Sequence, residues 1–115
     1  MRKIDIDSRT LEFGVRIVRF VNLLPKTVAG AKIGSQLIRS GTSIGANVEE
    51  ALGGHTKMDF KYKINIAKKE ARETKYWLKL IIISGLTKSN EGELLLKEAD
   101  ELVAILSTIV KNTRS

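Results

Sequence analysis

The sequence predicts an all-α protein: an antiparallel up-down-up-down four-helix bundle, formed as a single domain over residues 1–115. Three observations predict this class. Apolar residues recur every three or four positions along almost the whole chain, which is the period of an α-helix. Alternating β-branched runs bounded by hairpin turns are nearly absent. The joints between the helical stretches are short, so consecutive helices should lie antiparallel.

The first two helices are separated by a proline. The first is expected from about Ser8, as N-cap, to Leu24, because Pro25 ends it. It carries two apolar faces, so we expect it to contact neighbours on two sides. The second begins between Thr27 and Ala31 and ends at the C-cap signal Gly53-Gly54. The apolar sets are Leu11, Val15, Val18 and Val21; Phe13, Ile17, Phe20 and Leu24; and, on the second helix, Ile33, Leu37, Ile44, Val48 and Leu52.

The third and fourth helices carry heptad-like apolar seams. Thr56 with Asp59 and Asn90 with Glu93 are capping-box candidates that open them. Ser84-Gly85 closes the third helix, and the fourth is expected to run to about Asn112. Spacings of four and three residues alternate along both seams, which is the pattern of a helix packed against partners. The seams are Phe60, Ile64, Ala67, Ala71, Thr74, Leu78 and Ile81, and Leu95, Ala99, Leu102, Leu106 and Ile109.

Composition bounds the class of protein. Of the 115 residues, 43% are hydrophobic and 29% charged, as in folded globular chains. The absence of cysteine excludes disulfides and thiolate metal sites and fits a reducing compartment. The longest apolar run, Leu80 to Ile83, is far shorter than a membrane span, and the N-terminus lacks a signal-peptide core. We therefore expect a cytoplasmic protein with no membrane partner.

No pattern of catalytic residues stands out. The single histidine, His55, lies beside a glycine turn and lacks the spacing of a metal site, so we interpret it as a solvated loop residue. Dinucleotide, P-loop and nucleophile-elbow motifs are absent. The sequence therefore predicts a non-enzyme, with no catalytic residues, metal, cofactor or small-molecule substrate.

Positive charge is concentrated on the third helix. The chain has a formal charge of +7 and a pI of about 9.8, a balance that favours polyanionic partners. From Lys57 to Lys79 eight basic residues stand against three acidic ones, whereas three stand against five from Lys88 to Lys111. Both phosphate binding and structural ion pairing explain such a stripe. The basic stripe is Lys61, Lys68, Arg72, Lys75 and Lys79, with Arg16 and Arg19 as auxiliaries on the first helix.

Two further sets suggest helix or subunit contacts. A polar stripe on the second helix lies beside its apolar stripe, and we interpret it as a network that fixes bundle register or subunit contacts. A second flank of the third helix is more apolar than its seam requires, which favours a subunit interface. Stacking of Tyr76 or Trp77 on unpaired bases is the less favoured alternative. The sets are Arg39, Ser43, Asn47 and Glu50, and Ile66, Trp77 and Leu80.

These residues carry a family resemblance. The stretch Gln36–Glu50, QLIRSGTSIGANVEE, resembles the signature of the four-helix-bundle proteins encoded in intervening sequences of bacterial 23S rRNA genes. Leu23-Leu24-Pro25 and the segment from Ala67 to Leu80 match as well. The resemblance implies an up-down bundle assembled as a ring, a homopentamer. More distantly, the chain is similar to accessory proteins of diversity-generating retroelements, which form pentameric bundles and bind nucleic acid.

Together these observations predict a non-enzymatic homo-oligomer that binds nucleic acid through the basic stripe. Structured RNA is the first candidate ligand, and DNA is the second. Lysine-rich helix faces contact the phosphate backbone, so little base specificity is expected. The alternative is a protein-interaction scaffold, whose stripe receives an acidic partner or the acidic fourth helix of another subunit.

Overall fold

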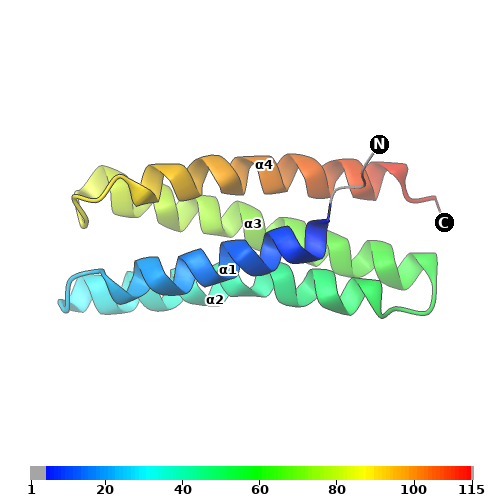
Figure 1. Cartoon of the computed structure of the whole chain (residues 1–115), viewed down its shortest axis with the longest axis horizontal. Helices are drawn as coiled ribbons and strands as arrows, with labels where there is room; N and C mark the ends of the chain where they lie inside the picture. The colour runs from blue at the N-terminus through cyan, green and yellow to red at the C-terminus, as the bar shows by residue number, and fades with distance from the viewer. Residues whose placement is uncertain (1–4, 115) are drawn as a thin grey trace.

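The computed structural model describes residues 5–114, and in that part of the chain four antiparallel helices are joined by short turns (Figure 1). No β-strand occurs within the described residues. The predicted all-α up-down-up-down bundle is confirmed. The helices are α1 (Ile6–Asn22), α2 (Val28–Leu52), α3 (Lys57–Ser84) and α4 (Glu91–Asn112).

Three helix ends follow the local signals in the sequence. The side chain of Thr27 accepts a hydrogen bond from the Gly30 amide at the start of α2, at 3.0 Å. Thr56 does the same for the Asp59 amide at the start of α3, also at 3.0 Å. Gly85 ends α3 with φ +71°, a left-handed conformation that glycine adopts without steric cost.

Two other helix starts differ from the expectation. Helix α1 begins two residues before Ser8, whose hydroxyl donates to the Asp5 carboxylate at 3.1 Å and caps no amide. Asn90 stands at the N-cap of α4 but makes no side-chain capping bond. The Ser89 hydroxyl accepts instead from the Glu91 amide, at 3.1 Å. The prediction of a capping box at Asn90 and Glu93 was therefore wrong, although α4 starts at the predicted position.

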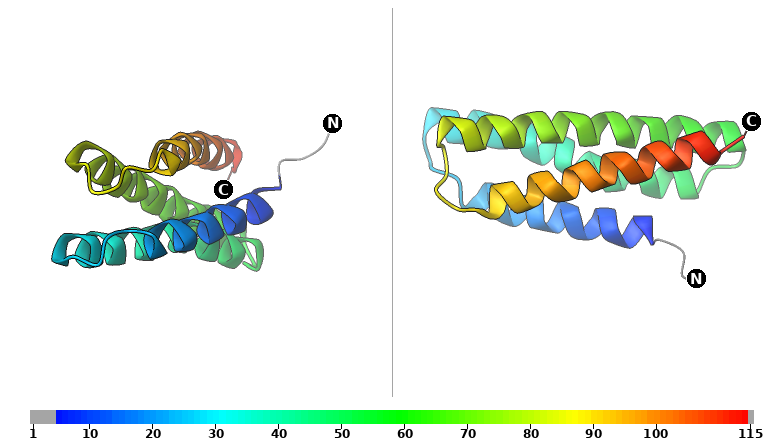
Figure 2. Two further views of the ribbon diagram at one scale, coloured as in Figure 1. Left: turned by 60° about the vertical axis from the view of Figure 1, so that its left-hand side comes forward. Right: turned by 90° about the horizontal axis from the view of Figure 1, so that it is seen from above.

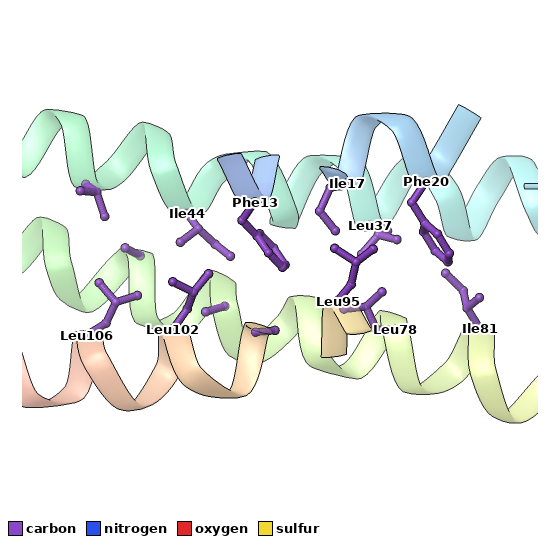
Figure 3. Close-up of a cluster of buried hydrophobic side chains, with 14 of the residues drawn as sticks. Phe13, Ile17, Phe20, Leu37, Ile44, Leu78, Ile81, Leu95, Leu102 and Leu106 are labelled. Atoms are coloured by element: carbon purple, nitrogen blue, oxygen red, sulfur yellow. The ribbon is translucent and has the colours of Figure 1, made fainter. Parts of the chain in front are cut away.

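The hydrophobic core runs along the bundle between the α1–α2 pair and the α3–α4 pair (Figure 3). Every seam residue of α3 from Ile64 to Ile81 is buried, and Phe60 is half-buried. At the end of α2, Ala51 is buried where Leu52 was expected. Side chains that meet in the core include Phe13, Ile17, Phe20, Leu37, Ile44, Leu78, Ile81, Leu95, Leu102 and Leu106.

Consecutive helices pack side by side, and α1 packs least extensively against α4 (Figures 1 and 2). Helices α1 and α2 approach closely because glycines face the contact. A Cβ added to Gly41 would lie 2.9 Å from two side-chain carbons of Ile17, and one added to Gly45 would lie 3.2 Å from the Thr10 carbonyl oxygen. Within residues 5–114 no helix combines the length and apolar character needed to cross a bilayer.

Candidate nucleic-acid interface

The basic stripe lies along the side of α3 that faces α4. Each of its members follows a seam residue by one position, so the helical period places them on one line beside the core. The Lys75 ammonium lies 2.5 Å from the Asp100 carboxylate of α4, which fixes the direction of that line. From Lys61 to Lys79 the stripe covers about 27 Å of helix, at a rise of about 1.5 Å per residue.

Four of the five stripe cations form no ion pair with any residue from 5 to 114; only Lys75 does. Arg72 and Lys79 are exposed, whereas Lys61 and Lys68 are half-buried. Half-burial suits a lysine that lays its alkyl stem on the helix surface and keeps its ammonium in water. The stripe therefore presents charge that the described fold does not neutralise.

Three acidic residues of α4 pair with arginines of α1 rather than with the stripe. Glu98 accepts two hydrogen bonds from the Arg9 guanidinium, at 2.6 and 2.8 Å, and Glu101 accepts another at 2.6 Å. The hydrogen bonds with Glu98, and to a smaller extent the bond with Glu101, raise the pKa of Arg9 above its usual value. Glu91 lies 3.3 Å from the Arg16 guanidinium. Asp100 is the one acidic residue of α4 that pairs with the stripe, among residues 5–114.

Arg16 and Arg19 do not extend the stripe. Arg16 is engaged with Glu91 on the side of α4 that faces α1, whereas Lys75 meets Asp100 on the side that faces α3. Helix α4 therefore separates the two basic regions. Arg19 is exposed and forms no ion pair within the described residues. The two arginines line a separate hollow of about 270 Å³ with Phe20, Leu23, Thr87, Ser89 and Glu91.

Two members of the polar stripe on α2 reach α3. Arg39 pairs with Glu73 and, at 3.3 Å, with Glu70, and it also donates to Gln36 at 3.2 Å. Glu50 lies 3.4 Å from the Lys63 ammonium. These three ion pairs lie on the flank of α3 opposite the basic stripe. Arg39 draws the acidic residues Glu70 and Glu73 towards α2, away from the stripe cations.

Ser43 and Asn47 bond within α2 and do not join that cluster. The Ser43 hydroxyl donates to the Arg39 carbonyl at 2.6 Å, and the Asn47 amide donates to the Ser43 carbonyl at 2.8 Å. Trp77 does join it, because its indole N–H donates to Glu73 at 2.9 Å. Like Trp77, the other apolar residues proposed for this flank of α3 are half-buried; they are Ile66 and Leu80.

Helix α1 contacts α2 and α4, but part of its second apolar face is uncovered in the described chain. Leu11, Val15 and Val18 remain exposed and line an apolar groove of about 450 Å³. The other lining residues are Asp7, Thr10 and Gly14 of α1 and Thr42, Gly45, Ala46 and Glu49 of α2. The helical spacing of Leu11, Val15 and Val18 predicted an apolar face. It could not predict that this face would lie uncovered in the described part of the chain. The expectation that α1 contacts neighbours on two sides is met by α2 and α4, but no helix within residues 5–114 covers the face formed by Leu11, Val15 and Val18.

A second feature was missed on the outward surface of α3. Tyr62, Lys69, Tyr76 and Ile83 are all exposed and recur at every seventh residue. Because the core seam follows the same heptad, this line lies opposite the core. The heptad spacing of the third helix would have been enough to predict this line from the sequence. We call these four residues the outer line.

The fold and charge pattern define a small all-α bundle with one basic helix face. Residues 2–108 match the family model described as 23S rRNA-intervening sequence protein, and the chain belongs to that family, whose function is unknown. The chain is 38% identical to a protein of unknown function from the S23 ribosomal protein family of Bacteroides thetaiotaomicron VPI-5482. Its crystal structure superimposes with a TM-score of 0.83, over 93% of this chain and 99% of that one. No curated protein matches the chain.

Proposed function

We propose that this chain is a non-enzymatic, oligomeric protein that binds structured RNA through the basic stripe on α3. The observation that carries the proposal is the set of four stripe cations without an ion-pair partner in residues 5–114. Like charges three and four residues apart destabilise a helix, and the acidic residues Glu70 and Glu73 of the same helix pair with Arg39 of α2 instead. Phosphates would offset that repulsion.

The proposed contacts make a quantitative claim about salt. Each phosphate neutralised by a lysine or arginine releases condensed counterions, so affinity falls as salt rises. Four contacts correspond to a log–log slope of about −3 to −4. Discrimination between base sequences should be small, because contacts to phosphates position the nucleic acid without reading it.

Self-association is the second part of the proposal. The groove lined by Leu11, Val15 and Val18 supports it, since a contiguous apolar surface on a small bundle is stabilised by covering. The family resemblance implies a ring of five copies. A ring repeats the stripe, so several modest contacts combine into one stronger interaction through effective concentration.

The test is fluorescence anisotropy of a labelled structured RNA, titrated with salt. Reversing the charge of Lys68, Arg72 and Lys79 to glutamate should weaken binding at least about tenfold and reduce the salt slope by about 2. The matched control changes the net charge by the same amount, because it reverses three exposed cations that all lie outside α3. These are Lys26, Lys32 and Lys97. Equal loss in both variants would show only a net-charge effect, and no binding by the parent at low salt would refute the proposal.

One observation favours a protein-interaction scaffold as the second candidate. The pair of Lys75 with Asp100 is a case in which the stripe already receives a carboxylate. An acidic segment of another protein or subunit would use the same chemistry. Mass measurement on the stripe variant separates the two candidates, because loss of the oligomer would favour the scaffold and an intact oligomer would favour the nucleic-acid ligand.

A further inference from the structure

The outer line of α3 combines two exposed tyrosines with free positive charge. Tyr62 is 63% exposed and Tyr76 is 57% exposed. We propose that Tyr76 stacks on an unpaired base, so that α3 binds single-stranded segments of RNA in preference to fully paired duplex. This inference rests on the proposed function and names the class of RNA that it would take.

The ring of Tyr76 packs against an aromatic neighbour. It meets the Trp77 ring edge-on, with the ring centroids 5.0 Å apart and the planes inclined at 75°. The Trp77 indole is itself fixed by its hydrogen bond to Glu73, which pairs in turn with Arg39 of α2. A ring oriented in this way loses little conformational entropy when a base stacks on it.

Positive charge flanks Tyr76 on both sides. Arg72 lies one helical turn before it and Lys79 lies one turn after it, and residues at these spacings are neighbours on a helix surface. Both are exposed, and neither forms an ion pair with another described residue. A nucleotide whose base stacked on Tyr76 would therefore have cations within reach of its flanking phosphates. Aromatic rings interleaved with basic residues are the common design of single-strand binding surfaces.

The geometry of RNA explains why the preference should be for unpaired segments. Bases inside an A-form helix are already stacked and paired, so no base face is available to a protein ring. Splayed single strands expose those faces. Tyr62 lies about 21 Å from Tyr76 along α3, at a rise of about 1.5 Å per residue, and so provides a second stacking position on the same face. Lys69 lies midway between them.

The experiment compares two ligands and three variants at one salt concentration. The ligands are a labelled oligouridylate of about 12 nucleotides and a fully paired RNA duplex of similar length. The variants are Tyr76→Ala, Tyr76→Phe, which keeps the ring, and Leu94→Ala, which removes a comparably exposed apolar side chain from α4. Circular dichroism and native mass test whether each variant is folded and assembled like the parent.

We expect Tyr76→Ala to weaken oligouridylate binding by about 5- to 100-fold and to leave duplex binding unchanged. Tyr76→Phe and Leu94→Ala should bind like the parent. Emission from Trp77, the single tryptophan, should change when oligouridylate binds the parent, because the ring it contacts is then covered.

Three outcomes would overturn the inference. Unchanged oligouridylate binding by Tyr76→Ala would exclude stacking, and the proposed function would still stand if the charge-reversed stripe variant lost binding. Equal loss of both ligands would show that Tyr76 does not distinguish unpaired bases. A lower native mass for Tyr76→Ala would make this face a subunit contact. Failure of the parent to bind either RNA would refute the proposed function itself.

Discussion

The hydroxyl groups of Ser40 and Thr74 lie 2.9 Å apart inside the hydrophobic core, where α2 packs against α3. Both side chains are completely buried. The Thr74 hydroxyl also lies 2.8 Å from the Glu70 carbonyl, whereas the Ser40 hydroxyl has only a 3.4 Å contact with the Leu37 carbonyl. The two residues are therefore unequal partners, because only Thr74 keeps a short hydrogen bond when the other is removed.

This inequality predicts an asymmetric double-mutant cycle. Thr74→Val should cost about 1–2 kcal/mol, because it leaves the buried Ser40 hydroxyl with one weak contact. Ser40→Ala should cost about 1 kcal/mol or less, since Thr74 still bonds to the Glu70 carbonyl. The double variant should cost less than the sum of the two. Denaturant unfolding of all four proteins measures the cycle, and strictly additive costs would contradict a coupled pair.

Gly41 predicts a steric limit on the α1–α2 contact. A Cβ at this position would lie 2.9 Å from two carbons of the buried Ile17, so Gly41→Ala should destabilise the fold by about 1–3 kcal/mol. Gly14→Ala is the matched control. Its nearest neighbour would be 4.0 Å away, and alanine is favoured over glycine within a helix by about 0.5–1 kcal/mol. Thermal unfolding should therefore move in opposite directions for the two variants, and equal shifts would count against close packing.

Two arginines predict unequal contributions from their ion pairs. Arg9→Ala should cost about 1–2 kcal/mol, because the guanidinium makes a two-bond contact with Glu98, whose side chain is only 18% exposed. Arg39→Ala should cost less than about 1 kcal/mol, since its side chain is 47% exposed and water screens the pair. Urea titration of the two variants tests the order. A larger loss for Arg39→Ala would contradict it.

Because the pKa of Arg9 is raised, the ion pairs of Arg9 should stabilise the fold equally well in neutral and mildly alkaline solution. A cation whose pKa is raised by folding stabilises the folded state below its unfolded pKa and loses that stabilisation only as pH rises through the folded value. Both values for arginine lie above the range in which the protein is handled. The difference in unfolding free energy between the parent and Arg9→Ala should therefore stay constant from about pH 7 to about pH 10. A steady decline across that interval would be the contrary result.

The apolar groove predicts a surface variant that changes assembly without unfolding the chain. Val15 is 40% exposed, so Val15→Glu should leave the helix content and melting cooperativity of the bundle intact. If a second copy covers the groove, the buried charge should lower the native mass of the assembly. Leu94→Glu, at a residue 52% exposed on α4, is the control and should leave the mass unchanged. An unchanged mass for Val15→Glu would remove this groove from the proposed subunit contact.

Local signals were sufficient for the four helices and most of the core. The buried seam from Ile64 to Ile81 repeats a period written in neighbouring residues, and the Thr56 cap and Gly85 stop each act within one helical turn. The caps predicted at Ser8 and Asn90 were wrong because neighbouring groups form the local hydrogen bonds instead. Ser8 bonds to Asp5, and Ser89 caps the Glu91 amide in place of Asn90.

The sequence by itself determined the class of fold, the stripe on α3 and the family, because helical period and motif spacing are properties of adjacent residues. Only the tertiary structure decided which partner each charge meets. Glu98 and Glu101 turn to Arg9 and leave all but Lys75 of the stripe without an ion pair in the described chain, and Leu11 stays uncovered. These outcomes depend on how each helix is rotated about its axis and registered against its neighbours. Packing of the whole core sets that rotation, and no single helix encodes it.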